Sequence, residues 1–162
     1  MGVGRAIEKM IVFSDGHMND ITHLLKVYAY AKAIGECEQL DVATQETLEL
    51  AAVVHDIACP LCRKKYGSTD AKWQEKEGGA LARHLLEEIG YKEEVVSRVS
   101  YLVAHHHTYT GVDGLDYQIL LEADYLVNAN EKNLSADSIR AAMASFFKTK
   151  TGIHLLESMY LR

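Results

Sequence analysis

The sequence predicts an all-α protein that forms a single domain. The chain has 162 residues, of which 48% are hydrophobic and 25% charged, and this length and composition are typical of one globular domain. One proline, eleven glycines and long stretches rich in alanine, leucine, glutamate and lysine favour helices over a loop-rich β fold. No stretch shows a convincing alternation of apolar and polar side chains, so we expect little or no sheet.

Helices are expected to follow one another along the chain, with no repeat or linker between them. Glycine often follows the last residue of a helix, so Gly35 and Gly90 predict two helix ends. A loop with two glycines is expected at Thr110–Gly114. The expected helices cover Arg5–Phe13, His17–Ile34, Thr44–Ala58, Gln74–Ile89, Glu93–His106, Asp116–Ala129, Ala136–Phe147 and Gly152–Leu161.

Short polar side chains and the proline predict further boundaries. Asp41 or Thr44 is suited to cap the third helix, and Pro60 lies just past its expected end. Ser135 is suited to start the penultimate helix. The segment Cys59–Lys72 is expected to be the longest irregular stretch and therefore a natural place for a functional loop.

The charge, hydropathy and cysteines restrict the classes of protein. A net charge of −6 argues against a protein that coats duplex nucleic acid, although a metal ion would supply positive charge for a small phosphorylated ligand. No apolar run approaches the roughly 18–20 residues that cross a bilayer, and the N-terminus lacks the apolar core of a signal peptide. We therefore expect a cytoplasmic protein without a membrane partner. Three cysteines do not make a disulfide framework.

The adjacent pair His55-Asp56 is the most informative feature of the chain. It closes the apolar run LELAAVVHDI, so both side chains are expected near the core. Burial of an ionised carboxylate costs several kcal/mol of folding free energy, unless a cation or a hydrogen-bond network offsets this cost. A divalent metal offsets it directly, and imidazole with carboxylate suits zinc, iron or manganese.

Two further residues on other helices have the character of metal ligands. His23 lies beside the apolar positions Leu24 and Val27 of the second expected helix. Asp124 projects from an apolar helix face, because its neighbours one turn away are leucines and a valine. A carboxylate there needs a cation, donors or a proton. Together the four residues form a mixed nitrogen and oxygen set that suits a catalytic metal site.

The order of these residues resembles the signature of the HD superfamily of metal-dependent phosphohydrolases. The matching segments are NDITHLLKVYAYA around His23, AAVVHDIA around His55-Asp56 and ILLEADYLV around Asp124. The resemblance covers about residues 15–130, and we expect the helices of residues 135–162 to pack on that part. Residues 1–162 are thus expected to form a single HD-type helical bundle.

The resemblance implies a divalent metal ion and a reaction class. It implies that His23, His55, Asp56 and Asp124 hold the ion, which is Fe, Mn, Zn, Ni, Co or Mg. It also implies hydrolysis of a phosphate ester or anhydride, and we expect a small metabolite, most plausibly a nucleotide, as the substrate. Asp56 is expected to act in catalysis as well, by bridging to a second ion or by orienting the attacking water.

A second metal site is also suggested. Two-metal members of the superfamily carry an adjacent histidine pair on a later helix, and His105-His106 resembles it. We expect these two residues to bind a second ion, or to bind phosphate and transfer protons, with His105 as a catalytic acid. Such members often place another histidine before a Gly-Ala pair, where this chain has glutamates. Glu75 or Glu77 is therefore a candidate oxygen ligand.

The expected loop after the His-Asp pair carries candidate substrate contacts. Several HD phosphodiesterases have lysine three residues after the aspartate, where this chain has Cys59. Arg63 or Lys64, which follow, are candidates to bind phosphate. Tyr66 and Trp73 are candidates to stack on a base.

Other functions compatible with the sequence stay open at this stage. The first is a non-catalytic HD module that senses a nucleotide or a metal. The second is oxidative chemistry at a di-iron HD site, and the third is a zinc-thiolate or redox role for Cys59 and Cys62, whose function the sequence leaves open. A homodimer is a further expectation, because the apolar C-terminal stretch is suited to pack on the core or on a second chain.

Overall fold

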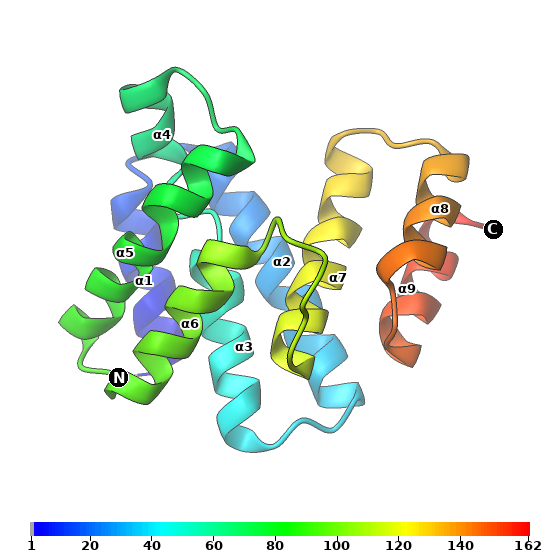
Figure 1. Cartoon of the computed structure of the whole chain (residues 1–162), viewed down its shortest axis with the longest axis horizontal. Coiled ribbons are helices and arrows are strands. Elements are labelled where there is room, and N and C mark those ends of the chain that lie inside the picture. The colour runs from blue at the N-terminus through cyan, green and yellow to red at the C-terminus, as the bar shows by residue number, and fades with distance from the viewer. Residues whose placement is uncertain (1) are drawn as a thin grey trace.

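The computed structural model describes residues 2–162 and confirms the all-α prediction (Figure 1). Within this part of the chain every regular element is a helix, and no strand is present. The helices are α1 (Val3–Phe13), α2 (Met18–Cys37), α3 (Val42–Val54), α4 (Cys59–Tyr66), α5 (Ala71–Ile89), α6 (Glu93–His105), α7 (Leu115–Glu131), α8 (Ala136–Phe146) and α9 (Lys150–Tyr160). None of these helices combines the length and apolar character that a membrane crossing demands.

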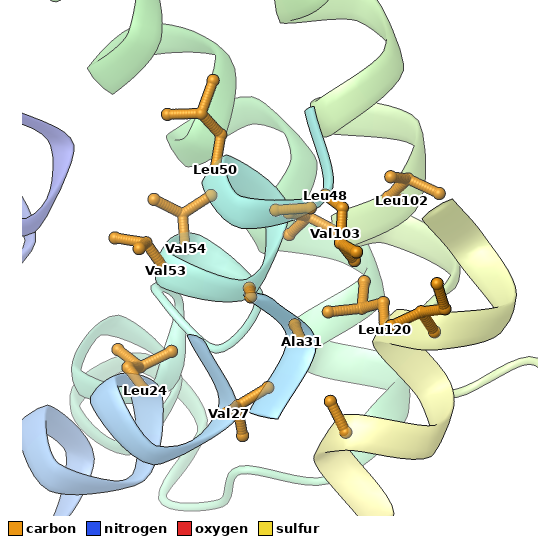
Figure 2. Packing of buried hydrophobic residues seen from close by; sticks show 14 of the residues in the cluster. Leu24, Val27, Ala31, Leu48, Leu50, Val53, Val54, Leu102, Val103 and Leu120 are labelled. Carbon is orange, nitrogen blue, oxygen red and sulfur yellow. The ribbon is translucent and has the colours of Figure 1, made fainter. Parts of the chain in front are cut away.

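Helix α3 forms the centre of the bundle. It packs against α1, α2, α6 and α7, so that all its residues from Thr47 to Val54 are buried. Figure 2 shows how its side chains meet those of α2, α6 and α7; the labelled residues are Leu24, Val27, Ala31, Leu48, Leu50, Val53, Val54, Leu102, Val103 and Leu120. A helix that is apolar on most of its surface is stable only in such a position, which explains the apolar run before His55, interrupted only by Glu49.

Several predicted helix boundaries are confirmed. Asp41 caps α3, since its carboxylate accepts a hydrogen bond from the backbone N–H of Thr44 at 3.0 Å. Ser135 caps α8 in the same way. Gly90 follows α5 in the left-handed conformation, with φ at 98°.

The predicted helix end at Gly35 is wrong. Helix α2 continues through this residue to Cys37. A Cβ atom at Gly35 would lie 2.3 Å from Oε1 of Gln45 on α3. The glycine therefore allows close packing of two helices and does not end one of them.

The irregular segment predicted at Cys59–Lys72 is also partly wrong. Residues 59–66 form α4, and α3 ends at Val54 and not at Ala58. Pro60 lies in the first turn of α4, where its missing N–H costs no helical hydrogen bond. The proline thus belongs to the start of a new helix. Gly67, with φ at 67°, ends α4, and the chain is irregular only from there to Asp70.

Helices α8 and α9 form a hairpin beside α7, at the side of the molecule away from α1 and α5 (Figure 1). Helix α9 contacts α7 and α2, and Leu156 on it is fully buried. The C-terminal hairpin therefore packs on α7 and α2 through α9.

Candidate metal centre

The pair His55-Asp56 lies at the end of the central helix. His55 follows the last residue of α3, and its side chain is fully buried. Because the apolar residues of α3 lie in the core, the two polar side chains that follow them lie at the inner end of that core. A backbone carbonyl, that of Ala52, accepts a hydrogen bond from Nδ1 of His55 at 2.8 Å. This contact places the proton on Nδ1 and leaves Nε2 with a lone pair in the neutral ring.

The structure brings the four predicted ligand residues together from α2, α7 and the end of α3. Nε2 of His23 lies 3.2 Å from Nε2 of His55. The same atom lies 3.2 Å from Oδ2 of Asp56 and 3.2 Å from Oδ1 of Asp124. Nε2 of His55 lies 3.3 Å from Oδ1 of Asp124 and 3.6 Å from Oδ2 of Asp56. Three of these atoms, on His23, His55 and Asp56, form a group that could hold one ion, and Oδ1 of Asp124 lies beside the two imidazole nitrogens of that group.

The chemistry of these atoms fits a divalent metal ion. Nδ1 of His23 donates to Glu131, so neutral His23 and His55 both turn an Nε2 lone pair inward. With both rings neutral in this way, Oδ1 of Asp124 is buried without a hydrogen-bond partner. Ligand atoms about 2.0–2.2 Å from one ion lie roughly 3–3.6 Å from one another, which matches the observed separations. The site therefore needs a cation at its centre.

Protons take the place of that cation when no metal is bound. Burial lowers the pKa of His23, but its hydrogen bonds to Asp124 and Asp56 outweigh burial and raise the pKa to about 11. Burial opposes ionisation of both carboxyl groups, yet the neighbouring histidines hold the pKa of Asp124 and of Asp56 below the usual range. A metal ion must consequently displace a proton from His23.

A second group of ligand atoms shares Asp56 with the first. Its members are Asp56, His106 and His107. Nε2 of His106 lies 3.0 Å from Oδ1 of Asp56, while its Nδ1 donates to the carbonyl of Val103. The two oxygens of Asp56 thus face different groups, since Oδ2 lies by His23 and His55. A carboxylate in this position is suited to bridge two centres of positive charge.

The histidine pair beside Asp56 is shifted by one residue from the predicted pair. The pair predicted at His105-His106 is His106-His107 in the structure. His105 is the last residue of α6, and its ring bonds to the carbonyl of Tyr101 and stacks on the Tyr101 ring at 4.0 Å. Burial, followed by the charge of His106, lowers the pKa of His107 to about 4, so that its ring is neutral at pH 7.

Comparison with known families agrees with this geometry. The model of the HD domain matches residues 20–132, which include all four predicted ligands. The chain belongs to the HD domain family. HD domains form a family of metal-dependent hydrolases, in keeping with the ligand atoms grouped here.

Solved structures show the same fold. The crystal structure of a predicted HD superfamily hydrolase from an uncultured Thermotogales bacterium is similar to this HD domain with a TM-score of 0.66. The two chains are 24% identical, and the similarity covers 96% of this chain and 82% of the other. A search of curated proteins finds no match.

A cavity of about 780 Å³ opens over the metal-binding groups of the HD domain. The candidate ligands His23, Asp56, His107 and Asp124 are part of its wall. The other residues that line it are Asn19, Asp20, Cys59, Arg63, Thr69, Asp70, Ala71, Gln74, Asn128, Glu131 and Lys132. This mixture of amides, carboxylates and two cations suits a polar, hydrogen-bonding ligand.

The predicted phosphate-binding residues have different positions. Arg63 lines the cavity, and the carboxylate of Asp20 from α2 holds its guanidinium in an ion pair. Lys64 is exposed and is not part of the cavity wall. Of these two residues, it is therefore Arg63 that is placed to contact a molecule bound in the cavity.

The two glutamates of α5 lie apart from the metal-binding groups. Glu75 accepts a hydrogen bond from Thr108 at 3.3 Å. Glu77 pairs with Lys65 at 2.8 Å and with the hydroxyl of Tyr66 at 2.5 Å. The α5 side chain that reaches the second group is instead Gln74, whose Oε1 lies 3.3 Å from Nε2 of His107.

The remaining candidates of the α4–α5 region are accounted for by packing. Tyr66 and Trp73 stack on each other, with ring centroids 3.9 Å apart, and neither lines the cavity. Cys59 and Cys62 are free, buried thiols. Burial raises the pKa of both, and this makes them poor nucleophiles at neutral pH. Only Cys59 touches the cavity.

Several site residues were missed by sequence reasoning, and helical spacing would have found some of them. Asn128 and Glu131 follow Asp124 by four and seven residues, so they lie on the same face of α7. Asp20 precedes His23 by three residues on α2. Gln74 and His107 have no comparable local signal.

Proposed function

We propose that this HD domain is a phosphohydrolase that cleaves a phosphate ester or anhydride of a small metabolite, and that the metabolite is a nucleotide. The grouping of ligand atoms on His23, His55 and Asp56, with Oδ1 of Asp124 beside both imidazoles, carries the proposal. The cavity supports it, because the guanidinium group of Arg63 lines the same wall as His23, Asp56 and Asp124. The N–H groups of Arg63 that do not bond to Asp20 remain free to bind a phosphoryl oxygen.

The four ligands His23, His55, Asp56 and Asp124 would hold the ion. When bound, a divalent ion supplies a Lewis acid for a phosphoryl oxygen and depresses the pKa of water. Arg63 binds a second phosphoryl oxygen, and its ion pair with Asp20 keeps the guanidinium oriented. Oδ1 of Asp56 accepts a hydrogen bond from the attacking water and so orients it.

A protonated imidazole beside Asp56 is suited to supply the proton that the leaving group takes up. Burial lowers the pKa of His106, but the hydrogen bond to Asp56 raises it overall. His106 therefore holds a proton on Nε2. Because its ring is buried and is not part of the cavity wall, we propose that this proton reaches the leaving oxygen through Oδ1 of Asp56 and that the proton of the attacking water returns by the same route. The role predicted for His105 passes to His106 in this proposal, because the ring of His105 lies against Tyr101.

The nucleotide part of the proposal rests on the polar character of the cavity. Amide side chains of Asn19, Gln74 and Asn128 line it together with Asp70, and these groups suit ribose hydroxyls and base edges. The expectations of a cytoplasmic location and of a homodimer stay predictions.

Metal content and hydrolysis, measured on the same preparation, test the proposal. Untagged protein purified without added metal or chelator is analysed by elemental mass spectrometry and assayed against a panel of nucleotides, sugar phosphates and phosphodiesters. We expect bound metal and turnover of at least one phosphate compound, both lost in Asp124→Asn. Glu88→Ala, which removes a surface ion pair with Lys9, is the control and retains both.

Other outcomes have defined meanings. A metal-replete protein that binds a nucleotide tightly and hydrolyses nothing in the panel would replace the hydrolase with a sensor module. A protein that takes up no metal on supplementation would overturn the proposal. Two ions per chain would assign the second to Asp56, His106 and His107 and would withdraw the proton-donor role of His106.

A further inference from the structure

The two buried histidines at helix ends are oriented by the backbone. His55 follows α3 and His106 follows α6, and each donates from Nδ1 to the carbonyl three residues earlier. The last carbonyls of a helix have no helical partner, so these contacts are available to the side chains. Residues at the ends of helices can thus fix an imidazole without help from another element.

His23 has no free backbone carbonyl near it in its own helix. It is the sixth residue of the twenty-residue helix α2, where the backbone carbonyls accept the N–H groups of the following turn. Its Nδ1 is instead bound by a side chain of another helix, with Oε1 of Glu131 at 2.5 Å. Glu131 is the last residue of α7, seven residues after Asp124.

The second oxygen of Glu131 is also bound. Nζ of Lys26 donates to Oε2 at 2.9 Å, and Lys26 lies on α2 three residues after His23. The two helices that supply His23 and Asp124 are therefore linked by a row of three side chains, Lys26, Glu131 and His23. The side chain of Glu131 is 29% exposed, so this row runs from the surface to the metal-binding group.

We propose that Glu131 is the positioning residue of this site: it fixes the ring of His23 with Nε2 inward and increases the electron density on that nitrogen. The inference rests on the proposed function, since it assumes a metal at His23. A carboxylate on the distal nitrogen of a histidine ligand selects the tautomer, fixes the ring and raises the basicity of the metal-facing nitrogen. Backbone carbonyls do the same for His55 and His106 without a charge. Of these three imidazoles, His23 is the one with an anionic partner on Nδ1.

Affinity for zinc, measured by competition with a chromogenic chelator, tests this role apart from hydrolysis. We expect Glu131→Ala to bind zinc about 10–100-fold more weakly, which is the effect typical of such outer partners. Glu131→Gln keeps an acceptor for Nδ1 but loses the charge, so it should recover part of this loss. Lys26→Met should weaken binding less than Glu131→Ala, because the bond to His23 survives. Glu88→Ala is the matched surface control and should bind zinc as the wild type does.

The thermal midpoint of each metal-free variant is measured in parallel. An unchanged midpoint with weakened zinc binding supports the positioning role, whereas wild-type zinc affinity in Glu131→Ala overturns it. If the alanine variant does not fold, Glu131→Gln decides, and equal affinity to the wild type overturns the inference. His23→Ala separates the two proposals: zinc binding that survives this change overturns the metal site itself. Loss in His23→Ala with no loss in the Glu131 variants overturns only the role of Glu131.

Discussion

Helix α7 carries two buried carboxylates two residues apart, Glu122 and Asp124, and their surroundings are opposite. Glu122 is fully buried, and four donors surround it: the backbone N–H groups of Lys148 and Thr149, the hydroxyl of Thr149 and the amide of Gln118. These contacts join α7 to the turn between α8 and α9.

The surroundings of Asp124 lack such donors. Its Oδ1 lies 3.2 and 3.3 Å from the Nε2 atoms of His23 and His55 and is without a hydrogen-bond partner. Both carboxylates are expensive to bury, but hydrogen-bond donors compensate only Glu122, whereas Asp124 depends on a proton on His23 or on a metal ion. The comparison separates a structural carboxylate from one that requires a cation, and burial alone does not make that distinction.

Asp124→Asn should have the largest effect on function. The change removes the negative charge and an oxygen ligand, so we expect metal content to disappear. Activity should fall by more than about 100-fold, since even outer-shell changes reach that value. The free energy of unfolding of the metal-free protein should fall by about 1–3 kcal/mol, because protonated His23 loses a charged hydrogen-bond partner. Elemental analysis and chemical denaturation check the two parts, and a stable metal load in the variant would contradict the assignment.

Glu122→Gln should show the reverse pattern. The amide N–H₂ of the new side chain would face donors that now bind a carboxylate oxygen, so buried donors lose their partner. We expect the free energy of unfolding to fall by about 3 kcal/mol, the upper range for an unsatisfied buried group. Metal affinity should stay within about twofold of the wild type at a temperature where the variant is folded. A variant as stable as the wild type would show that the contacts of Glu122 contribute little.

The pH dependence of metal binding should distinguish the two carboxylate environments. The pKa of His23 in the metal-free protein is about 11, so between pH 7 and pH 9.5 a metal ion must displace its proton. Affinity should therefore rise with pH, by about tenfold for each pH unit. The slope should be the same in Glu122→Gln. Titrations with a chelator of known pH dependence test this, and an affinity independent of pH would contradict it.

The same pKa shifts predict the stability of the metal-free protein. The pKa of His23 is higher in the folded than in the unfolded chain, so its contribution is complete below about pH 6.5 and declines as the pH rises towards 11. The pKa of Asp56 and of Asp124 is lower in the folded chain, so their contribution is present above about pH 4 and declines in acid. Bound metal should remove the alkaline decline. Thermal midpoints between pH 5 and pH 9.5, with and without zinc, measure it.

Gly152→Ala should give the smallest effect and should act on the Glu122 side alone. A Cβ atom there would lie 2.1 Å from Oε2 of Glu122 and 2.7 Å from Oγ1 of Thr149. The turn must shift, at a cost of about 1–3 kcal/mol in unfolding free energy. Metal content should not change. Loss of metal in this variant would mean that the two carboxylate environments are coupled through α7.

The sequence predicted much of the helical arrangement, and the four residues that it offered as metal ligands lie close to one another in the structure. The apolar run before His55 predicted a core helix, and α3 is that helix. The predictions that helices end at Gly35 and before Pro60 were wrong. Both residue types are common at helix ends, but the packing of the surrounding helices determines their positions here. At Gly35 the close approach of Gln45 matters more than the freedom of the backbone. At Pro60 a proline compatible with a helix start was interpreted as a helix stop.

The sequence by itself determined which side chains are available and on which helix face they lie, because helical periodicity is a local property. The pair His55-Asp56 after an apolar run and Asp124 among leucines followed from this. Only the tertiary structure decided which side chains meet. Successive residues of a helix point about 100° apart, so a one-residue shift at the end of α6 brings His107 and not His105 to Asp56.

Contacts between helices explain the other differences. The pairing of Glu131 with His23 and of Asp20 with Arg63 depends on how α2, α4 and α7 pack, and no local pattern encodes those distances. The same holds for the two carboxylates of α7: their side chains are equally charged in the sequence, and the atoms that other helices and turns present to them decide that Glu122 is satisfied while Asp124 requires a cation.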